Sequence, residues 1–192
     1  SIQGNVVNAT VADNTITNVG QAETAWAFGV VVRGNGDPVL VPKNVTVVGN
    51  DISDVVSNPS TSTVGVGVGL ESGSASDVTF VDNEISNAAY LIEDKTETVD
   101  LHGFVASNTL DRGALLAEGG NIVYGDVQPA VDAASSGDTV LLQPGSYEGS
   151  FDVETSNISI VSTDGADNTT LDIGAERIDV TADNVTVSGV SV

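Results

Sequence analysis

The sequence predicts an all-β fold, a solenoid of short parallel strands stacked coil on coil, with one short helix as a cap. Three observations favour it. Valine dominates the apolar residues, with 32 copies against 10 Leu and 10 Ile, and its stiff, branched side chain packs well on a pleated surface. A strand motif recurs four times in the first 120 residues, and only one segment has the pattern of an amphipathic helix.

The recurring motif is a short alternating strand, then Asn, any residue, and Ile or Leu. It occupies residues 9–19, 45–55, 78–88 and 103–113. One such repeat cannot bury its apolar face alone, so neighbouring repeats are expected to stack. Stacked strands lie about 4.8 Å apart, which places equivalent residues above one another. The pattern therefore predicts an inner ladder of Ile16, Ile52, Ile85 and Leu110. It also predicts a corner ladder of amides formed by Asn14, Asn50, Asn83 and Asn108.

A second kind of strand lies between these segments, at residues 28–34, 64–72, 88–94 and 114–120. The pattern changes at residue 121. Residues 126–136 are the best helix candidate, because Asp126 suits the N-cap and Gly137 suits the C-terminal stop. Short alternating strands follow as far as residue 192. The sequence thus predicts two domains, residues 1–120 and 121–192.

Two runs resemble a known family. The run VQPAVDAASSGDTVLLQPGSYEGSFDV (127–153) resembles the N-terminal cap of right-handed parallel β-helix proteins of the pectin-lyase-like superfamily. The Asn-x-Ile segments resemble the generic parallel β-helix repeats of later coils, including NosD-like proteins. The resemblance implies a right-handed parallel β-helix with one short capping α-helix. A cap normally comes first, so residues 1–120 resemble the end of one β-helix and 121–192 the start of another.

Both ends of the sequence have the pattern of a strand, in residues 1–11 and 185–192. If residues 185–192 are followed directly by residues 1–11, the joined sequence has the uninterrupted strand pattern of a β-helix coil. We therefore expect the chain to associate with copies of itself through the coil ends at the Ser1 and Val192 sides, because an open coil end carries unpaired backbone groups. Three interpretations stay open. The chain is one period of a tandem array, or a subunit whose open end is completed by the next subunit. Otherwise it contains two short β-helical lobes, or it is a fragment.

The charge of the chain excludes several classes of protein. Twenty-seven acidic residues face five basic ones, for a net charge of -22, so no basic patch for nucleic acid is expected. The absence of Cys excludes disulfides and thiolate metal sites, and the apolar runs are too short for a membrane span. Molar salt shortens the Debye length to about 3 Å and would screen this repulsion. The composition resembles that of haloarchaeal proteins, with an acidic secreted protein as the alternative.

The sequence predicts that this chain is not an enzyme. The Asn-Thr-Asp, Asp-Asp, Gly-His-Gly and Arg-x-Lys segments of polygalacturonases in this family are missing. Pectate lyases of the family use basic residues that a chain with five scattered bases does not supply. Glycosidase chemistry needs two opposed carboxylates. Among 27 acidic residues some pair lies close together by chance, so the proximity of two carboxylates alone does not indicate a glycosidase. The single histidine, His102, is expected to be a surface or corner residue of a strand, with a general base or metal ligand near Asp100 as the alternative.

Two kinds of binding or modification site are candidates. Asp164, Asp167 and Asn168 lie in a Gly-containing loop whose oxygen ligands suit Ca²⁺, although a solvated turn has the same composition. No other cofactor is expected. Glycosylation sequons begin at Asn8, Asn44, Asn157, Asn168 and Asn184.

Taken together, these patterns predict a non-enzymatic extracellular or cell-surface protein of a halophilic archaeon, assembling by end-to-end coil stacking. The alternatives are a carbohydrate- or calcium-binding module of a larger secreted protein and a polysaccharide-degrading enzyme. Trp26, Phe28 and Tyr90 are the aromatic candidates for a binding groove.

Overall fold

The computed structural model describes residues 1–20, 26–34, 41–56, 64–71 and 75–192. The described residues form twenty short strands and two helices, which confirms the predicted all-β class. The chain divides into two compact units, residues 1–110 (unit 1) and 111–192 (unit 2). The predicted change of pattern at residue 121 lies inside unit 2. None of the helices in the described ranges is long and apolar enough to cross a membrane.

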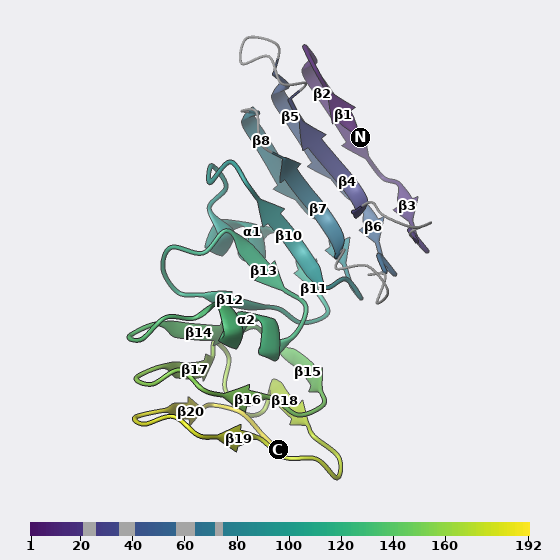
Figure 1. Cartoon of the computed structure of the whole chain (residues 1–192). Coiled ribbons are helices and arrows are strands. Elements are labelled where there is room, and N and C mark those ends of the chain that lie inside the picture. The colour runs from purple at the N-terminus through teal and green to yellow at the C-terminus, as the bar shows by residue number, and fades with distance from the viewer. Residues whose placement is uncertain (21–25, 35–40, 57–63, 72–74) are drawn as a thin grey trace. The chain divides into compact units, whose positions relative to one another are not determined.

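Unit 1 is built from three sets of parallel strands (Figure 1). The first set contains β1 (Ile2–Gln3), β4 (Ala27–Arg33), β7 (Gly65–Glu71) and β10 (Tyr90–Asp94). The second contains β2 (Val7–Ala12), β5 (Lys43–Val48) and β8 (Ser76–Val81). The third contains β3 (Thr15–Ile16), β6 (Asp51–Ile52), β9 (Glu84–Ile85) and β11 (Thr109–Leu110). Each of the first three repeats of unit 1 adds one strand to each set, and the fourth adds β10 and β11 with helix α1 between them.

The interior of unit 1 is an aliphatic ladder. Ile16, Ile52, Ile85 and Leu110 lie directly opposite one another in register. Two strand glycines make room for it, because a Cβ on Gly29 would collide with the Ile52 side chain and a Cβ on Gly67 would lie 2.7 Å from Ile85 Cγ2. Glycine in a strand interior is usually a weakness, and here it permits close packing of the inner ladder.

The fourth repeat corrects the sequence-based expectation of a single helix. Residues 103–107 were expected to be a strand, but Leu101–Ser107 form helix α1. The Asp100 side chain caps it by accepting a hydrogen bond from the His102 N–H, at 3.1 Å. Phe104 is buried and meets Phe80 edge to face, with ring centroids 5.9 Å apart. His102 is therefore an exposed residue of a helix and not of a strand.

Unit 2 begins with β12 (Ala114–Leu116) and β13 (Ile122–Tyr124), followed by helix α2 (Val127–Ala133). Asp126 is the N-cap of α2, as its position predicted, but the helix ends at the C-cap Ala134 and not at 136. Three parallel sets follow: β14 (Thr139–Leu142) with β17 (Ser159–Ser162) and β20 (Thr186–Ser188), β15 (Gly145–Glu148) with β18 (Thr169–Asp172), and β16 (Asp152–Val153) with β19 (Asp179–Val180).

One strand of unit 2 departs from the all-parallel expectation. β12 pairs antiparallel with both β13 and β14. It is also shorter than the predicted strand 114–120 and ends at Leu116. A turn and β13 follow, so the chain reverses direction here before the parallel coils of unit 2 begin.

Candidate functional site

The corner of unit 1 is held by a ladder of asparagine side chains. Asn14 Nδ2 donates to Asn50 Oδ1 at 2.9 Å, Asn50 Nδ2 to Asn83 Oδ1 at 2.9 Å, and Asn83 Nδ2 to Asn108 Oδ1 at 2.8 Å. Each Oδ1 also accepts the backbone N–H of the preceding asparagine in the ladder. Asn50 and Asn83 are buried, so these bonds satisfy polar groups that water does not reach.

Four of the five sequon asparagines belong to a second kind of ladder. Asn44 Nδ2 donates to Asn8 Oδ1 at 2.6 Å, and Asn184 Nδ2 donates to Asn157 Oδ1 at 3.0 Å. All four have positive φ, between 52° and 62°, a conformation that asparagine tolerates better than most residues. The fifth, Asn168, is exposed and reaches the Asp164 carbonyl at 3.3 Å. A glycan attached to Asn44 or Asn184 would replace one of the two hydrogens on the Nδ2 atom that donates in the ladder.

A regular series of left-handed residues is a further feature that the sequence-based predictions do not include. Positive φ recurs every five residues in the first three repeats of unit 1, at Asn8, Asp13 and Asn18, at Asn44, Gly49 and Asp54, and at Asp77, Asp82 and Asn87. Only Asn, Asp and Gly occupy these nine positions, since they adopt this conformation at the least cost. The five-residue spacing of these residue types is visible in the sequence and would have located the bends.

The calcium candidates lie together in an exposed turn. Asp164, Asp167 and Asn168 follow β17 in a loop whose Gly165 has φ of 82°. The Ser162 hydroxyl accepts the N–H groups of Asp164 and Gly165 at 3.1 and 2.9 Å, so the loop is closed by its own hydrogen bonds. Within the described residues, no group of three or more His, Cys, Asp or Glu side chains is placed to hold a metal ion.

The only tryptophan lies in an aromatic and charged cluster on unit 1. Trp26 is 40% exposed and stacks on Phe28, with ring centroids 6.3 Å apart and planes 19° apart. Lys95 Nζ lies 4.3 Å from the centroid of the Trp26 ring. We call Trp26, Phe28, Glu71, Glu93 and Lys95 the tryptophan cluster. Tyr90, the third aromatic candidate, lies two strands from Phe28, since both are opposite Val66 in register.

The charges of the tryptophan cluster are partly buried. Lys95 Nζ lies 2.8 Å from Glu71 Oε1 and 3.3 Å from Glu93 Oε2. The Glu93 side chain is only 8% exposed, and among the described residues its Oε2 has an ion-pair contact but no well-oriented hydrogen bond. Burial raises the pKa of Glu93, and the positive charge of Lys95 offsets only part of this. The carboxylates outweigh burial at Lys95 and raise its pKa.

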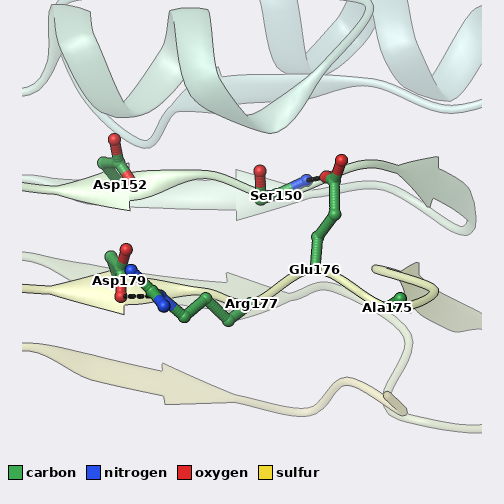
Figure 2. Close-up of a pocket in the computed structure, with 6 residues that line it drawn as sticks. All are labelled: Ser150, Asp152, Ala175, Glu176, Arg177 and Asp179. Atoms are coloured by element: carbon green, nitrogen blue, oxygen red, sulfur yellow. Dashed lines mark hydrogen bonds and ion pairs between the residues drawn. The ribbon is translucent and has the colours of Figure 1, made fainter.

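A shallow pocket of about 350 Å³ lies on unit 2, where β16 pairs with β19. Figure 2 shows the residues that line it. Arg177 Nε donates to Asp179 Oδ1 at 2.6 Å, and Glu176 Oε2 accepts the Ser150 N–H at 2.8 Å. Asp152 lies directly opposite Asp179 in register, so the guanidinium weakens the repulsion between two neighbouring carboxylates. The residues that line the pocket are mostly exposed, so water reaches their carboxylates.

Exposed valines gather at the outermost strands of the two units. Val7 lies on β2, and Val180 and Val187 lie on β19 and β20, each an outermost strand of its sheet. Val192 is 77% exposed and follows an isolated bridge between Ser191 and Thr170. Elsewhere in the described ranges, the exposed large apolar residues are Trp26 and Val56. The apolar surface thus coincides with strand edges whose backbone groups are open to pairing.

Comparison with known proteins identifies no relative: no protein-family model matches the chain, and no curated protein or solved structure is significantly similar to it.

Proposed function

We propose that this chain is a non-enzymatic structural protein of the cell surface of a halophilic archaeon, which assembles end to end through its outermost coils into a surface layer or filament. The observation that carries the proposal is the coincidence of exposed valines with open strand edges at β2, β19 and β20. Edges of this kind are templates for pairing with another chain, and the apolar side chains add a favourable burial term.

The architecture proposed for this function is a right-handed parallel β-helix related to the pectin-lyase-like superfamily. Three sets of parallel strands per unit support it, as does the stacking of Asn and Ile residues from coil to coil. In a β-helix every coil except the two end coils is paired on both sides. Growth is therefore restricted to the ends, and stability is close to a sum over neighbouring coils.

The halophilic setting is supported by the placement of acids on neighbouring strands. Three pairs of like charges lie directly opposite each other in register: Asp51 with Glu84, Glu148 with Asp172, and Asp152 with Asp179. Directly opposed like charges destabilise a sheet. At about 5 Å in water each pair repels by roughly 0.8 kcal/mol, and molar salt screens most of this. The acidic faces also discourage sideways association, which leaves the coil ends for assembly.

The test of the proposal compares two valine substitutions in about 3 M KCl. Val180 on the outermost strand β19 is 49% exposed, and Val56, in the second coil, is 53% exposed. Val180→Glu and Val56→Glu therefore add the same charge at similar exposure. We expect the unchanged protein to form extended assemblies by light scattering and electron microscopy, Val180→Glu to reduce them strongly, and Val56→Glu to retain them. A monodisperse monomer at molar salt, or equal effects of both variants, contradicts the proposal.

The tryptophan cluster supports a second candidate function, recognition of a neutral sugar. A partly exposed indole stacked on Phe28 offers apolar surface for a sugar ring beside the Lys95 ammonium, and the partly exposed Glu71 offers acceptors for its hydroxyl groups. The charge of -22 disfavours an anionic glycan. Calorimetry with neutral oligosaccharides tests this function, with loss of binding expected for Trp26→Ala and retention for Trp26→Phe. Equal binding by both variants, or none by the unchanged protein, contradicts it.

A further inference from the structure

We infer that residues 178–192 of one copy pair in register with residues 2–16 of a second copy, with Asn184 directly opposite Asn8. This inference rests on the proposed end-to-end assembly and names the partner surface and its register. It places β20 of the first copy beside β2 of the second.

The two edges have the same backbone frame. Asn8 and Asp13 have φ of 57° and 54°, and Asn184 and Gly189 have φ of 55° and 70°. Each edge contains this pair of left-handed residues five positions apart, so a single shift of 176 residues superimposes the two pairs. Gly4 of the first edge, with φ of 80°, falls opposite Val180 of β19 and has no left-handed counterpart. Within unit 1, the coils that pair with each other repeat this same five-residue frame, as Asn44 and Gly49 do opposite Asn8 and Asp13.

The same shift aligns the strands on both sides of these bends. Residues 186–188 of β20 fall opposite 10–12 of β2, and Asp179 of β19 falls opposite Gln3 of β1. Ser191, which bridges to Thr170, falls opposite Thr15 of β3. Strand β20 and one paired position on each side of it therefore match with no insertion between them, and a slip of one residue would turn every side chain to the other face.

The asparagine ladders of the two edges have matching polarity. Asn44 Nδ2 donates to Asn8 Oδ1, and Asn184 Nδ2 donates to Asn157 Oδ1. In both cases the later asparagine donates to the earlier one. Among the described residues, Asn8 Nδ2 and Asn184 Oδ1 make no hydrogen bond, so one edge presents a donor and the other an acceptor. A hydrogen bond from Asn8 Nδ2 to Asn184 Oδ1 would join the two ladders in the same direction.

The apolar side chains also match in this register. Val187 falls opposite the half-buried Val11, whose neighbours in β5 and β8 continue the same row. Val192 falls opposite Ile16, the first residue of the inner ladder. Val192, which is more exposed than any other valine that the structure describes, would thus extend the aliphatic interior of the next copy, which is a favourable burial.

The charges are compatible as well. The acids within the two edge segments are Asp13, Asp179 and Asp183. In this register each lies opposite an uncharged residue, in contrast to the like-charge pairs within the chain. The junction therefore adds no directly opposed carboxylates.

Disulfide trapping tests the register, because the chain contains no cysteine. Thr10 and Thr186 are exposed and directly opposite each other in the inferred junction. Their Cα atoms would lie about 5 Å apart, within the span of a disulfide. The double variant Thr10→Cys/Thr186→Cys is expected to form covalent multimers under mild oxidation in about 3 M KCl, and dithiothreitol should return them to monomers. The matched control Thr10→Cys/Ser188→Cys places the sulfurs two residues out of register, about 8 Å apart by Cα and beyond disulfide reach.

Multimers from the first pair and few from the control support the inferred register. If both pairs cross-link equally, or the control alone does so, the register is wrong, while assembly seen by light scattering still supports the proposed function. If neither variant nor the unchanged protein assembles at molar salt, both proposals fail. Circular dichroism melts of the reduced variants check that the fold is intact.

Discussion

The buried Asn83 of the asparagine ladder should contribute much more to the free energy of unfolding than the exposed Asn14 at its edge. Asn83→Ala removes a side chain that is 1% exposed and takes part in five hydrogen bonds. The same substitution at Asn14, whose side chain is exposed, removes bonds that water replaces. The two variants therefore compare the same Asn→Ala substitution at a buried and at an exposed position.

The magnitude follows from the partners that each truncation leaves behind. In Asn83→Ala the buried N–H of Asn50 loses its acceptor, which costs about 1–3 kcal/mol. The remaining bonds contribute roughly 1 kcal/mol each, but their partners keep other contacts, as Asn50 Nδ2 does with Val48 O. We expect a loss of about 3–5 kcal/mol for Asn83→Ala and about 0.5–1 kcal/mol for Asn14→Ala. The larger loss is a substantial part of the usual stability of a domain.

Urea unfolding followed by circular dichroism in a constant molar concentration of KCl measures both variants. The unfolding midpoint of Asn83→Ala should fall far below that of the unchanged protein, with an unchanged slope. The midpoint of Asn14→Ala should move only slightly. Equal midpoints for the two variants would refute the reasoning, because they would mean that burial of the ladder does not determine its contribution.

Three further outcomes are expected. Raising KCl from about 0.15 to 3 M should raise the Tm of the unchanged protein more than that of Asp51→Asn, because salt screens the repulsion between Asp51 and Glu84. Equal increases in the Tm of the two proteins would argue against this. Because burial raises the pKa of folded Glu93, the unchanged protein should lose stability relative to Glu93→Gln as pH rises from about 4 to 7; a constant difference in urea midpoints contradicts this. Tyr147→Phe leaves the buried Gly113 N–H without its acceptor and should cost about 2 kcal/mol, so a calorimetric loss under about 0.5 kcal/mol would be unexpected.

The repeated strands were accessible from sequence because stacking requires only that equivalent residues recur. The asparagines that occupy the same position of the recurring motif are those that hydrogen-bond to one another, although the spacing between them varies from 36 to 25 residues. The first helix was not accessible in this way. Its segment carries the strand motif, but Phe104 packs against Phe80 of β8, and a contact between residues distant in sequence overrides local preference.

The tryptophan cluster also depends on the tertiary structure. Trp26, Phe28 and Tyr90 are scattered aromatics in the sequence, and nothing local shows which would be exposed. The fold brings Lys95, from the segment after β10, over the Trp26 ring before β4 and pairs it with Glu71 of β7. Because these partners come from three coils, their charges and burial follow only once the register between coils is fixed.

The sequence by itself determined the all-β class, the strand frame of the first three repeats and the helix cap at Asp126. These follow from side-chain alternation, from backbone preference and from the capping hydrogen bond, which act within a few residues. The tertiary structure decided which valines remain exposed, which amide of each ladder stays open, and where like charges face each other. Those properties belong to pairs of residues in neighbouring coils, and the loops between coils set which residues become neighbours.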